Sequence, residues 1–592
     1  MKKMKKWIAA LIAVIMTAVM MPMTAMAAGT TTLTVDGVDA LTTSSGEGWS
    51  FNSSTSTLTL DGYNGGSIVA TYMDLKVVLA EGSKNVISTT EEYGLANVHD
   101  PYDGPYNSLS VEGTANSSLE ITANNHAIFA HGSISIVGCN LVANTTTSTA
   151  TGNMECISSH STIDIENCNI TVNTNGVGIT CYNEHNIVNS TITVNAGIIG
   201  VHANNENLTI TGSTLDITGG TAALYSYFGT IQLTNCTGEL DASTAAIYGQ
   251  NLSAESDTTL KDCELTLNAP YGIMTYSGIF IENGDLTLNC DTGVYAYSAS
   301  YQADSNISGT AVVDGTPCTT RAFLIYGTYS SEDTAEVNGI IHQNLGDTAT
   351  EKVILSGTMS ISKDTAYAKI IEIQENANIT VEQGVSFDLS AAPSVTVSGV
   401  LTNRGTLTLN GEQTENQGTI YNYGVISLAD SKSIINNGTI YSACTSEFDL
   451  TPYGESGIVM HTQLVKVDAK DPTYTSAGNI EYWYCENCDK YFSDEAATQE
   501  IAYEDTIIPM LEQEPDTTTE NDDTDTSDTS DTTQANDTEK NTSAQSEKKG
   551  SATSPKTGAD ENFALIWVSV LAACAAVLTT ATVYKRKRKY SK

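Results

Sequence analysis

A short repeated segment with strand-like alternation constrains the fold of this chain more than any other feature. Each copy alternates apolar and polar residues, has a small residue near its middle and usually ends in Asn. Successive copies lie 21 to 29 residues apart, which is typical of a solenoid whose loops differ in length. The copies are ISIVGCNLVAN (134–144), IDIENCNITVN (163–173), HNIVNSTITVN (185–195), LTITGSTLDIT (208–218), IQLTNCTGELD (231–241), TTLKDCELTLN (258–268) and IFIENGDLTLN (279–289).

Columns of equivalent residues follow if the copies stack, because neighbouring strands lie about 4.8 Å apart. The central small residues are Cys139, Cys168, Ser190, Ser213, Cys236, Cys263 and Gly284. Cys exchanges here with Ser and Gly, and the mature chain has an odd number of Cys before residue 554, which does not favour a disulfide framework. We therefore predict buried, reduced thiols that pack as small apolar groups.

A second column lies five residues after the first and is dominated by Asn. Its members are Asn144, Asn173, Asn195, Thr218, Asp241, Asn268 and Asn289. We predict that they lie at turns and hydrogen-bond to the coils above and below. Such an Asn ladder resembles that of the pectin-lyase-like right-handed β-helices. The resemblance implies an all-β fold for residues 28–345, with a right-handed parallel β-helix.

A third column consists mainly of rings. The apolar residues Ile128, Ile157, Ile179, Ile199, Leu224, Ile247, Ile273 and Val294 are each followed three residues later by one member. The members are His131, His160, Tyr182, His202, Tyr227, Gln250, Tyr276 and Tyr297. Odd offsets in a strand point to opposite faces, so a buried apolar residue predicts an outward-facing ring. Two hypotheses stay open: the rings stabilise neighbouring coils, or they bind a linear glycan whose sugar rings pack on aromatic faces.

Charge and composition argue against several classes of function. The formal net charge of -43 disfavours nucleic acids and anionic lipids as partners. No Lys or Arg occurs between Lys84 and Lys261, whereas the β-helical pectate lyases and polygalacturonases grip acidic polymers with such residues. Hydrolysis requires two facing carboxylates, and no such cluster recurs at equivalent coil positions. We predict a non-catalytic protein, with a polysaccharide lyase or glycoside hydrolase as the weaker alternative.

The period of the repeat becomes shorter after about residue 345. Residues 346–445 repeat a shorter unit in which Asn and Gly recur, and Asn-Gly marks turns. The units are Asn403-Arg404-Gly405, Asn416-Gln417-Gly418, Asn422-Tyr423-Gly424 and Asn437-Gly438. We predict a second β-solenoid with a shorter period, which extends the first or caps its open end.

Residues 446–511 are predicted to form a small β module. The segment resembles small repeats of clostridial surface proteins that contain a His, a Cys, a YWxC motif and a CxxC motif. The matching residues are His461, Cys485 and Cys488. These residue types suggest structural zinc, which requires four N or S ligands. Tyr474 stands where the family often has Cys, and Cys444 is the only other candidate, so we favour a buried CxxC without a cofactor over bound zinc.

The two ends of the chain indicate export and anchoring. Residues 1–27 have a Lys-rich start, an apolar run and an Ala-Met-Ala ending, which is typical of a secretory signal peptide. Residues 512–553 are acidic, rich in Thr and Asp and too poor in apolar residues to fold, so we predict a disordered spacer. Residues 554–592 contain SPKTG, a predicted transmembrane helix over 563–584 and a basic tail.

This C-terminal combination resembles the LPxTG-type sorting signal of Gram-positive surface proteins. In that family a sortase cuts between Thr and Gly and joins the Thr to peptidoglycan. The matching residues are Pro555, Thr557 and Gly558, with Ser554 in place of the usual Leu, as in variants used by some clostridial sortases. A simple C-terminal membrane anchor is the alternative. Either way, the resemblance implies display on the surface of a Gram-positive cell, with sortase and peptidoglycan as partners for the sorted form.

Together these features predict a cell-wall-anchored adhesin that binds a polysaccharide or host glycan through the His/Tyr column. The alternative is a structural stalk without a specific ligand. The sequence does not identify the ligand, because stacking on aromatic rings tolerates many sugars.

Overall fold

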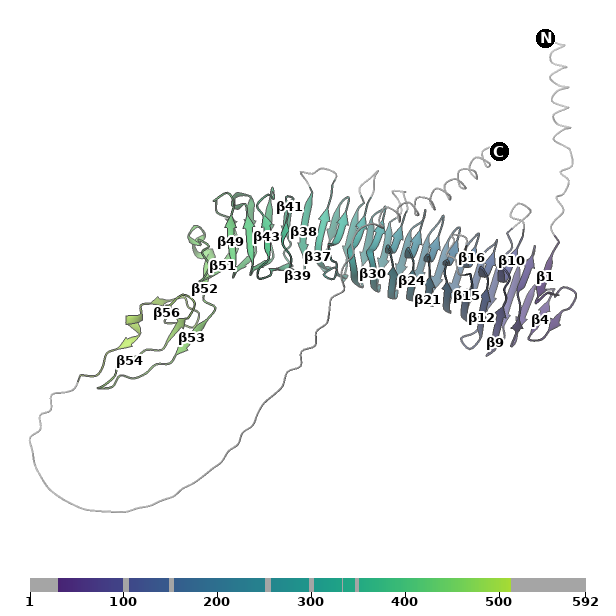
Figure 1. The fold of residues 1–592 in the computed structure, drawn as a ribbon, viewed down its shortest axis with the longest axis horizontal. Coiled ribbons are helices and arrows are strands. Elements are labelled where there is room, and N and C mark those ends of the chain that lie inside the picture. Colours follow the sequence, from purple (N-terminus) through teal and green to yellow (C-terminus); the bar gives the residue numbers. More distant parts are fainter. Residues whose placement is uncertain are drawn as a thin grey trace, which may run out of the picture. The chain divides into compact units, whose positions relative to one another are not determined.

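The computed structural model describes residues 30–99, 106–147, 154–250, 257–297, 303–332, 334–345 and 351–512. In these residues the chain is almost entirely β-structure, wound into a right-handed-type β-solenoid of about 16 turns (Figure 1). The predicted all-β solenoid is therefore confirmed. The predicted signal peptide, the acidic spacer beyond residue 512 and the sorting signal lie outside the described residues. Within those residues, no helix is both long and apolar enough to cross a membrane.

Two compact units make up the chain. The first comprises Met1–Lys466 and Trp483–Glu500, and the second comprises Val467–Tyr482 and Ile501–Lys592. In its described part, the second unit contains β54 (Gly478–Asn479), which pairs antiparallel with β58 (Ile507–Ile508), and the 3-10 helix η3 (Tyr503–Thr506). Residues 446–511, which the sequence places in one small module, thus contribute to both units.

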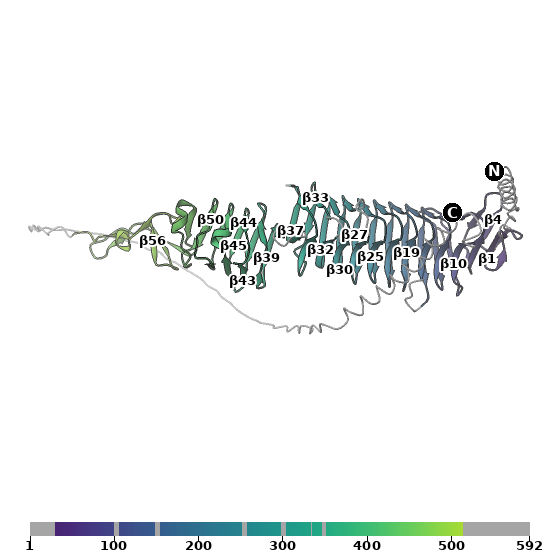
Figure 2. The same cartoon turned by 90° about the horizontal axis from the view of Figure 1, so that it is seen from above.

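The first solenoid forms three faces, and most of its coils contribute one short strand to each (Figure 2). The short-strand face consists of β5 (Thr57–Leu60), β8 (Leu75–Leu79), β11 (Leu109–Glu112), β14 (Ile134–Val137), β17 (Ile163–Glu166), β20 (His185–Val188), β23 (Leu208–Thr211), β26 (Ile231–Thr234), β29 (Thr258–Lys261), β31 (Ile279–Glu282), β33 (Ser305–Ser308) and β36 (Tyr329–Ser331). The ladder face consists of β6 (Asn64–Gly65), β9 (Lys84–Ser88), β12 (Ser118–Ala123), β15 (Asn140–Thr145), β18 (Asn169–Thr174), β21 (Thr191–Ala196), β24 (Thr214–Gly219), β27 (Thr237–Ala242) and β34 (Val312–Asp314).

The third face is called the ring face, because it carries most of the aromatic side chains. It consists of β7 (Ile68–Thr71), β10 (Tyr93–Val98), β13 (His126–Ala130), β16 (Glu155–Ser159), β19 (Val177–Cys181), β22 (Ile199–Ala203), β25 (Ala222–Ser226), β28 (Ala245–Gly249) and β35 (Arg321–Ile325). Three longer strands, β30 (Glu264–Thr275), β32 (Asp285–Ala296) and β37 (Glu336–Gln343), run through both the ladder face and the ring face.

Antiparallel strands flank the first coils at the N-terminal end. They are β1 (Thr32–Val35), β2 (Val38–Asp39), β3 (Ser45–Gly46) and β4 (Trp49–Asn52). β1 pairs antiparallel with β7, and β4 pairs antiparallel with β5. Antiparallel strands at the end of a parallel stack cover backbone groups that would otherwise invite association with another chain.

Alternating side chains build one continuous apolar core inside these coils. Stacked strands are in register, so Ile128, Ile157 and Ile179 lie above one another, and each is 0% exposed. The cluster of buried apolar residues extends from Leu33 to Ile354. Burying an Ile side chain stabilises the fold by about 1.5–3 kcal/mol, so this repeated column accounts for the stacking.

A left-handed turn separates the short-strand face from the ladder face. The residue before each small central residue has a φ between 49° and 69°. Gly, Asn and Asp tolerate this backbone better than other residues do. The residues at this position are Gly138, Asn167, Asn189, Gly212, Asn235, Asp262, Asn283 and Gly309.

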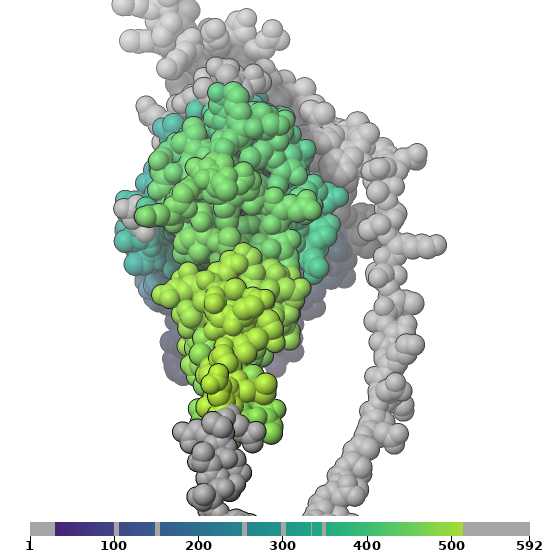
Figure 3. All heavy atoms as spheres, turned by 90° about the vertical axis from the view of Figure 1, so that its left-hand side faces the viewer, coloured from purple at the N-terminus to yellow at the C-terminus, as the bar shows by residue number. Residues whose placement is uncertain are grey.

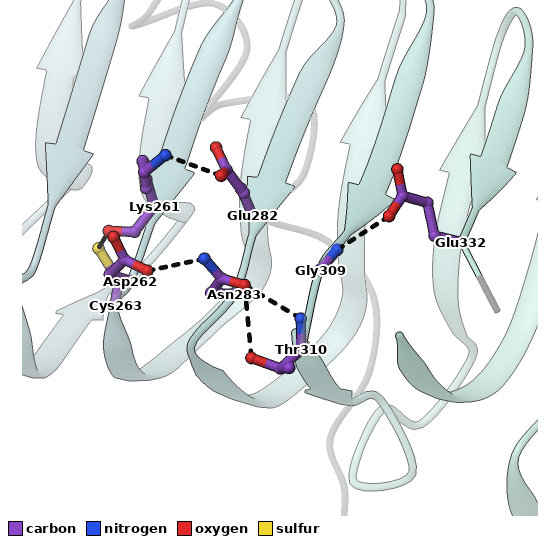
Figure 4. A network of polar contacts seen from close by, with 8 residues as sticks. All are labelled: Lys261, Asp262, Cys263, Glu282, Asn283, Gly309, Thr310 and Glu332. Carbon is purple, nitrogen blue, oxygen red and sulfur yellow. Dashed lines mark hydrogen bonds and ion pairs between the residues drawn. The ribbon is translucent and has the colours of Figure 1, made fainter. Parts of the chain in front are cut away.

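Side chains at these turns also join neighbouring coils (Figure 4). Asn283 donates its Nδ2 to the Oδ1 of Asp262 at 2.8 Å, and the Oδ1 of Asn283 accepts the backbone N–H of Thr310 at 3.0 Å. Beside them the Lys261 ammonium pairs with the Glu282 carboxylate at 2.7 Å. The turn therefore bonds one coil to the next.

The predicted Asn ladder exists, but its predicted location at turns is wrong. Its members lie within the ladder-face strands, on the outer surface of the coil, where none is fully buried. The hydrogen bonds run from Asn173 Nδ2 to Asn144 Oδ1 (2.9 Å), Asn195 to Asn173 (3.2 Å), Asn268 to Asp241 (2.7 Å) and Asn289 to Asn268 (2.9 Å). A different set of residues occupies the turns, and it includes Asn167, Asn189, Asn235 and Asn283.

The central small column is buried, as predicted. Cys139, Cys168, Ser190, Ser213, Cys236 and Cys263 are each at most 5% exposed, and Gly284 is half-buried. The cysteines among the described residues are free. The Ser members also bond along the column, since the Oγ of Ser190 accepts the backbone N–H of Cys168 at 3.1 Å.

A second solenoid follows, with its own apolar core from Val353 to Tyr453. One set of its parallel strands is β38 (Lys352–Ser356), β41 (Ile370–Ile373), β44 (Val395–Val397), β47 (Thr414–Asn416) and β50 (Ile435–Asn436). Another is β39 (Thr358–Ile361), β42 (Asn378–Val381), β45 (Val400–Asn403), β48 (Thr419–Asn422), β51 (Thr439–Ala443) and β52 (Gly457–Met460). The third is β40 (Thr365–Ala366), β43 (Ser386–Leu389), β46 (Thr406–Leu409) and β49 (Val425–Leu428), and the 3-10 helices are η1 (Gly411–Gln413) and η2 (Thr451–Ser456).

The joint between the solenoids is antiparallel, because β37 and β38 pair with Ile341 opposite Ile354. Figure 3 looks along the stack, with the green coils of the second solenoid in front of the teal and blue coils of the first. The stack continues past residue 445, since β52 pairs in parallel with β51. Residues 446–460, which the sequence places in the small module, therefore include a strand of the solenoid.

The N-x-G units of the second solenoid mark turns, as predicted, and their Asn side chains are buried. Asn403, Asn416 and Asn422 are each 0% exposed. Asn403 Nδ2 donates to Asn422 Oδ1 at 2.9 Å, and Asn416 Nδ2 donates to Asn436 Oδ1 at 2.6 Å. The ladder residue of the fourth unit is thus Asn436, and the predicted Asn437 lies one residue further on.

Candidate functional site: the ring face

The strands of the ring face alternate between buried and outward-facing side chains. In β25, Leu224 and Ser226 are 0% exposed, whereas Tyr225 between them is half-buried. Tyr227 follows the strand and is also half-buried. The residues one and three positions after the buried apolar residue therefore face outward together, as the odd offsets predict.

Two adjacent columns of rings result from this alternation. The outer column lies just past the C-terminal end of each strand and contains His131, His160, Tyr182, Tyr227, Gln250, Tyr276, Tyr297 and Tyr326. The inner column lies within the strands and contains Phe129, Ser158, Thr180, His202, Tyr225, Tyr248, Met274, Tyr295 and Leu324.

The predicted position of His202 is wrong. Val201, rather than Ile199, pairs with Ile179, and His202 pairs with Thr180. His202 therefore belongs to the inner column, next to Tyr225. Asn204 follows Ala203 at the outer position of this coil, where it interrupts the row of rings.

The inner column, the outer-column ring Tyr326 and the neighbouring Phe228 were not predicted from the sequence. Phe228 packs against Tyr227 with centroids 4.3 Å apart, and Tyr326 packs against Tyr297 at 5.0 Å. A signal for the inner column was present in the Tyr-x-Tyr spacing of Tyr225 and Tyr227 and of Tyr295 and Tyr297.

The N-terminal part of the ring face is rich in His and closely packed. His131 is only 8% exposed and contacts His99 and His160 edge-on, with centroids 4.7 and 4.8 Å apart. His160 in turn contacts Tyr182 at 5.1 Å. Burial lowers the pKa of His160, and the neighbouring His126 and His99 lower it further. The His160 ring is therefore uncharged at neutral pH.

The C-terminal part of the ring face is rich in Tyr. Tyr225 contacts Tyr248 at 5.1 Å, and Tyr276 contacts Tyr297 at 6.1 Å. Burial raises the pKa of Tyr295 to about 12, with help from neighbouring phenols. The Tyr295 ring consequently keeps its proton over the physiological range and presents a neutral hydroxyl group.

The exposed fraction of the rings varies along the face. Among the rings of the two columns and the adjacent Phe228, the most exposed are Tyr182 (45%) and Phe228 (50%), on either side of the interruption at Asn204. His202 lies between them, stacked on Tyr225 with centroids 5.0 Å apart. Burial lowers the pKa of His202 to about 4, so its ring is also neutral at pH 7.

A hollow of about 580 Å³ lies beside the N-terminal end of the ring face and is lined by Asp36, Val69, Glu91, Glu92 and Tyr93 among others. Tyr93 also stacks on His126 with centroids 5.4 Å apart, so the hollow adjoins the ring face. Its carboxylates accept hydrogen bonds but do not attract a polyanion.

A cluster of metal-ligating side chains lies elsewhere, at the C-terminal end of the first unit. Cys444, His461, Cys485 and Cys488 each offer one ligand atom, and these atoms lie within 4.8 Å of one another. The sequence analysis named three of these residues as weak metal candidates and Cys444 as the only possible fourth. Tyr474, which replaces a family Cys, is 61% exposed.

Comparison with known families bears on the ring face directly. A family model described as carbohydrate-binding domain-containing protein matches residues 58–312. No curated protein matches the chain. The matched range contains both ring columns as far as Tyr297. The part of the chain that carries the ring face is thus similar to a carbohydrate-binding domain.

Proposed function

We propose that the ring face binds a linear, uncharged polysaccharide that lies along the solenoid axis. The observation that carries the proposal is that four successive coils, from β25 to β32, each carry at least one outward-facing Tyr, within the range that resembles a carbohydrate-binding domain. Aromatic faces pack against the apolar faces of sugar rings, while phenol hydroxyls bond to sugar hydroxyls.

The spacing of the rings suits an extended polymer. Six coil intervals separate Tyr182 from Tyr326, which corresponds to about 29 Å at about 4.8 Å per interval. Each interval is comparable to the length of one sugar unit in an extended chain. A polymer along the face would therefore meet a ring at nearly every unit, with Asn204 and Gln250 offering amide groups at the interruptions.

Charge favours a neutral ligand. The face lacks Lys and Arg between Lys84 and Lys261, and burial lowers the pKa of His160 and of His202, so these two rings are neutral at pH 7. The whole chain has a formal net charge of -43, so it repels an acidic polymer. Neutral plant, microbial or host glycans fit these properties.

The Tyr-rich part is the better candidate for contact. Tyr182 and Phe228 are the most exposed rings of the face, whereas His131 is buried among other rings. We assign scaffolding to His131 and His160, and ligand contact to Tyr182, the Tyr-rich part and Phe228.

The test is a binding screen of the purified protein against neutral and acidic glycans, followed by calorimetry with the best ligand. The test variant replaces Tyr182, Tyr227, Phe228 and Tyr276 by Ala. The matched control replaces Tyr421 and Tyr441, a stacked pair of half-buried rings in the second solenoid, 5.0 Å apart. We expect the test variant to bind at least about tenfold more weakly, a loss of about 1.4 kcal/mol or more, and the control to bind normally.

Equal binding by a folded test variant would refute the proposal and favour the structural stalk, in which the rings only join coils. Circular dichroism establishes that each variant is folded. The same samples are assayed for release of sugars or unsaturated products. Turnover by the unmodified protein would replace the proposed binding role with a polysaccharide lyase or glycoside hydrolase.

The proposed setting is the cell surface, on the evidence of the sequence alone. Ser554, Pro555, Thr557 and Gly558 resemble a sortase motif, after a spacer that would hold the solenoids away from the wall. Changing Thr557→Ala should move the protein from the peptidoglycan fraction to the membrane and medium. Unchanged covalent attachment to peptidoglycan would contradict sorting at this motif.

A further inference from the structure

The cluster at the C-terminal end of the first unit has the composition of a structural metal site. Three thiols and one imidazole are a common ligand set for structural zinc, which is bound tetrahedrally by four N or S atoms. All four ligand atoms lie within 4.8 Å of one another. Two of the separations are shorter: Cys444 Sγ lies 3.7 Å from Cys485 Sγ, and Cys488 Sγ lies 3.3 Å from His461 Nδ1.

These distances suit ligands around a shared ion as well as thiol hydrogen bonds, and they exclude a disulfide between the side chains. With Zn–S bonds of about 2.3 Å, a tetrahedral centre separates two sulfurs by about 3.8 Å. With a Zn–N bond of about 2.0 Å, it separates a sulfur from a nitrogen by about 3.5 Å. The observed 3.7 Å and 3.3 Å are close to both values. A disulfide requires about 2.05 Å between sulfurs.

The ligands come from two different parts of the fold. Cys444 follows β51 and His461 follows β52, so both extend from the last coil of the second solenoid. Cys485 ends β55 (Tyr482–Cys485), and Cys488 lies in the turn before β56 (Lys490–Phe492). These two strands form a hairpin in which Trp483 pairs with Phe492. A single ion would therefore link the hairpin to the end of the solenoid.

Neighbouring contacts hold the ligands in place. The His461 ring packs against Phe492, with centroids 4.5 Å apart, and Phe492 is 2% exposed. The backbone N–H of Cys444 donates to the carbonyl of Met460 at 2.9 Å, which fixes Cys444 beside His461. Cys485 is 0% exposed, so its thiol lies in a dry environment. Ordered surroundings of this kind are typical of a structural site.

We propose that Cys444, His461, Cys485 and Cys488 bind one Zn²⁺ and so fasten the CxxC hairpin to the last solenoid coil. Cys444 supplies the ligand that the position of Tyr474 lacks. Binding replaces the protons of three thiols with one ion, so three protons leave and the site carries a net charge of about −1. The proposal is independent of glycan binding, because the ring face lies on other coils.

The experiment uses the full-length protein, purified under reducing conditions without chelator. Elemental analysis should give one zinc per chain. Replacement by Co²⁺ should give the visible absorption of a tetrahedral site and a near-ultraviolet thiolate band, and this readout needs no variant. We expect Cys444→Ser to lose the zinc in competition with a chelator at a concentration that the unmodified protein withstands.

Cys318→Ser is the matched control, because Cys318 is also a half-buried free thiol but lies in the first solenoid. It should keep one zinc and the cobalt spectrum. Two results would overturn the proposal: a reduced protein that takes up neither zinc nor cobalt, or a native Cys444–Cys485 disulfide found by mass spectrometry. Zinc retention by Cys444→Ser equal to that of the unmodified protein would also overturn it, since the site would then not need the solenoid ligand.

Discussion

In the first solenoid the Asn ladder and the aromatic rings both face outward, whereas the second solenoid keeps its Asn ladder inside. Asn195 of the first ladder is exposed, and Asn422 of the second is 0% exposed. The same side chain on the same type of coil thus has two uses. On the surface it competes with water and contributes little, while in the interior it satisfies groups that water cannot reach.

The two solenoids also differ in how many aromatic rings they carry on the surface. The first solenoid has two columns of them on one face, whereas the second has the stacked pair Tyr421 and Tyr441 and the cation–π contact of Arg404 with Tyr423. We infer that the two solenoids have different roles: the first presents a binding surface, and the second is a connecting segment held together by internal hydrogen bonds. Four predictions test this difference in roles, from the largest effect to the smallest.

Removing a core ring from the second solenoid should loosen that solenoid alone. Phe387 is 0% exposed and belongs to the second core, so Phe387→Ala should cost about 3–5 kcal/mol. Hydrogen exchange should accelerate in residues 351–460 while residues 118–297 keep their protection. Phe323→Ala, in the first core, is the matched change. Equal loss of protection in both solenoids after either change would show that they unfold as one unit.

Acid should weaken the first solenoid more than the second. Burial lowers the pKa of His185 to about 3 in the folded protein, compared with about 6.5 in an unfolded chain. Between these values the unfolded chain binds a proton that the folded chain does not, so stability falls as the pH decreases below about 6.5. The expected loss from this residue is about 2 kcal/mol at pH 5.

The second solenoid lacks this source of acid sensitivity, because residues 351–460 contain no His. Hydrogen exchange measured from pH 7 to pH 5 distinguishes the two regions. His185→Leu serves as the control and should reduce the pH dependence of the first solenoid, while His202 continues to contribute to it. An equal decline in both solenoids, or an unchanged decline in His185→Leu, would contradict the assignment.

Much of this fold was predictable because alternation and a repeated small residue specify a stacked coil. The location of the ladder was not, since a copy such as IENCNITVN contains both Asn167 and Asn173. Either Asn suits a left-handed turn, and only the register shows that Asn167 takes it, with a φ of 54°. Sequence identifies the residue type that a turn needs, but it does not choose between two candidates six residues apart.

The candidate sites show the same limit. Ile199 and Val201 differ by two positions, so both point to the same side of a strand, and alternation could not reveal that Val201 pairs with Ile179. Because of this ambiguity, His202 was predicted in the outer column, although it belongs to the inner one. The four metal-ligating side chains were not joined into one set for another reason: Cys444 lies before residue 446, where the small module was predicted to begin, and was named only as a further candidate.

Matched substitutions in the two Asn ladders test how much more a buried ladder residue contributes to stability than an exposed one. Asn422 Nδ2 donates to Ser442 Oγ at 3.0 Å and to Ser446 Oγ at 2.8 Å, so Asn422→Leu leaves buried groups without partners. We expect a loss of about 1–3 kcal/mol. Asn195→Leu removes an exposed ladder residue and should change stability by about 0.5 kcal/mol or less. Chemical denaturation of each variant gives the difference, and similar losses at both positions would undo the proposed distinction.

The smallest expected effect is the loss of protein stability when a single ring is removed. If the Tyr-rich part of the first solenoid exists for contact with a ligand, removing one ring should cost no more than removing a ring from the second solenoid. Tyr276 and Tyr421 are both half-buried. Tyr276 contacts Tyr297 at 6.1 Å and Tyr248 at 6.4 Å, and Tyr421 contacts Tyr441 at 5.0 Å. Cross-strand pairs contribute about 0.2–1 kcal/mol, so Tyr276→Ala and Tyr421→Ala should lower stability by similar, small amounts. A markedly larger loss for Tyr276→Ala would mean that the ring face holds the coils together, and the weaker binding of ring variants would then need to be attributed to altered structure.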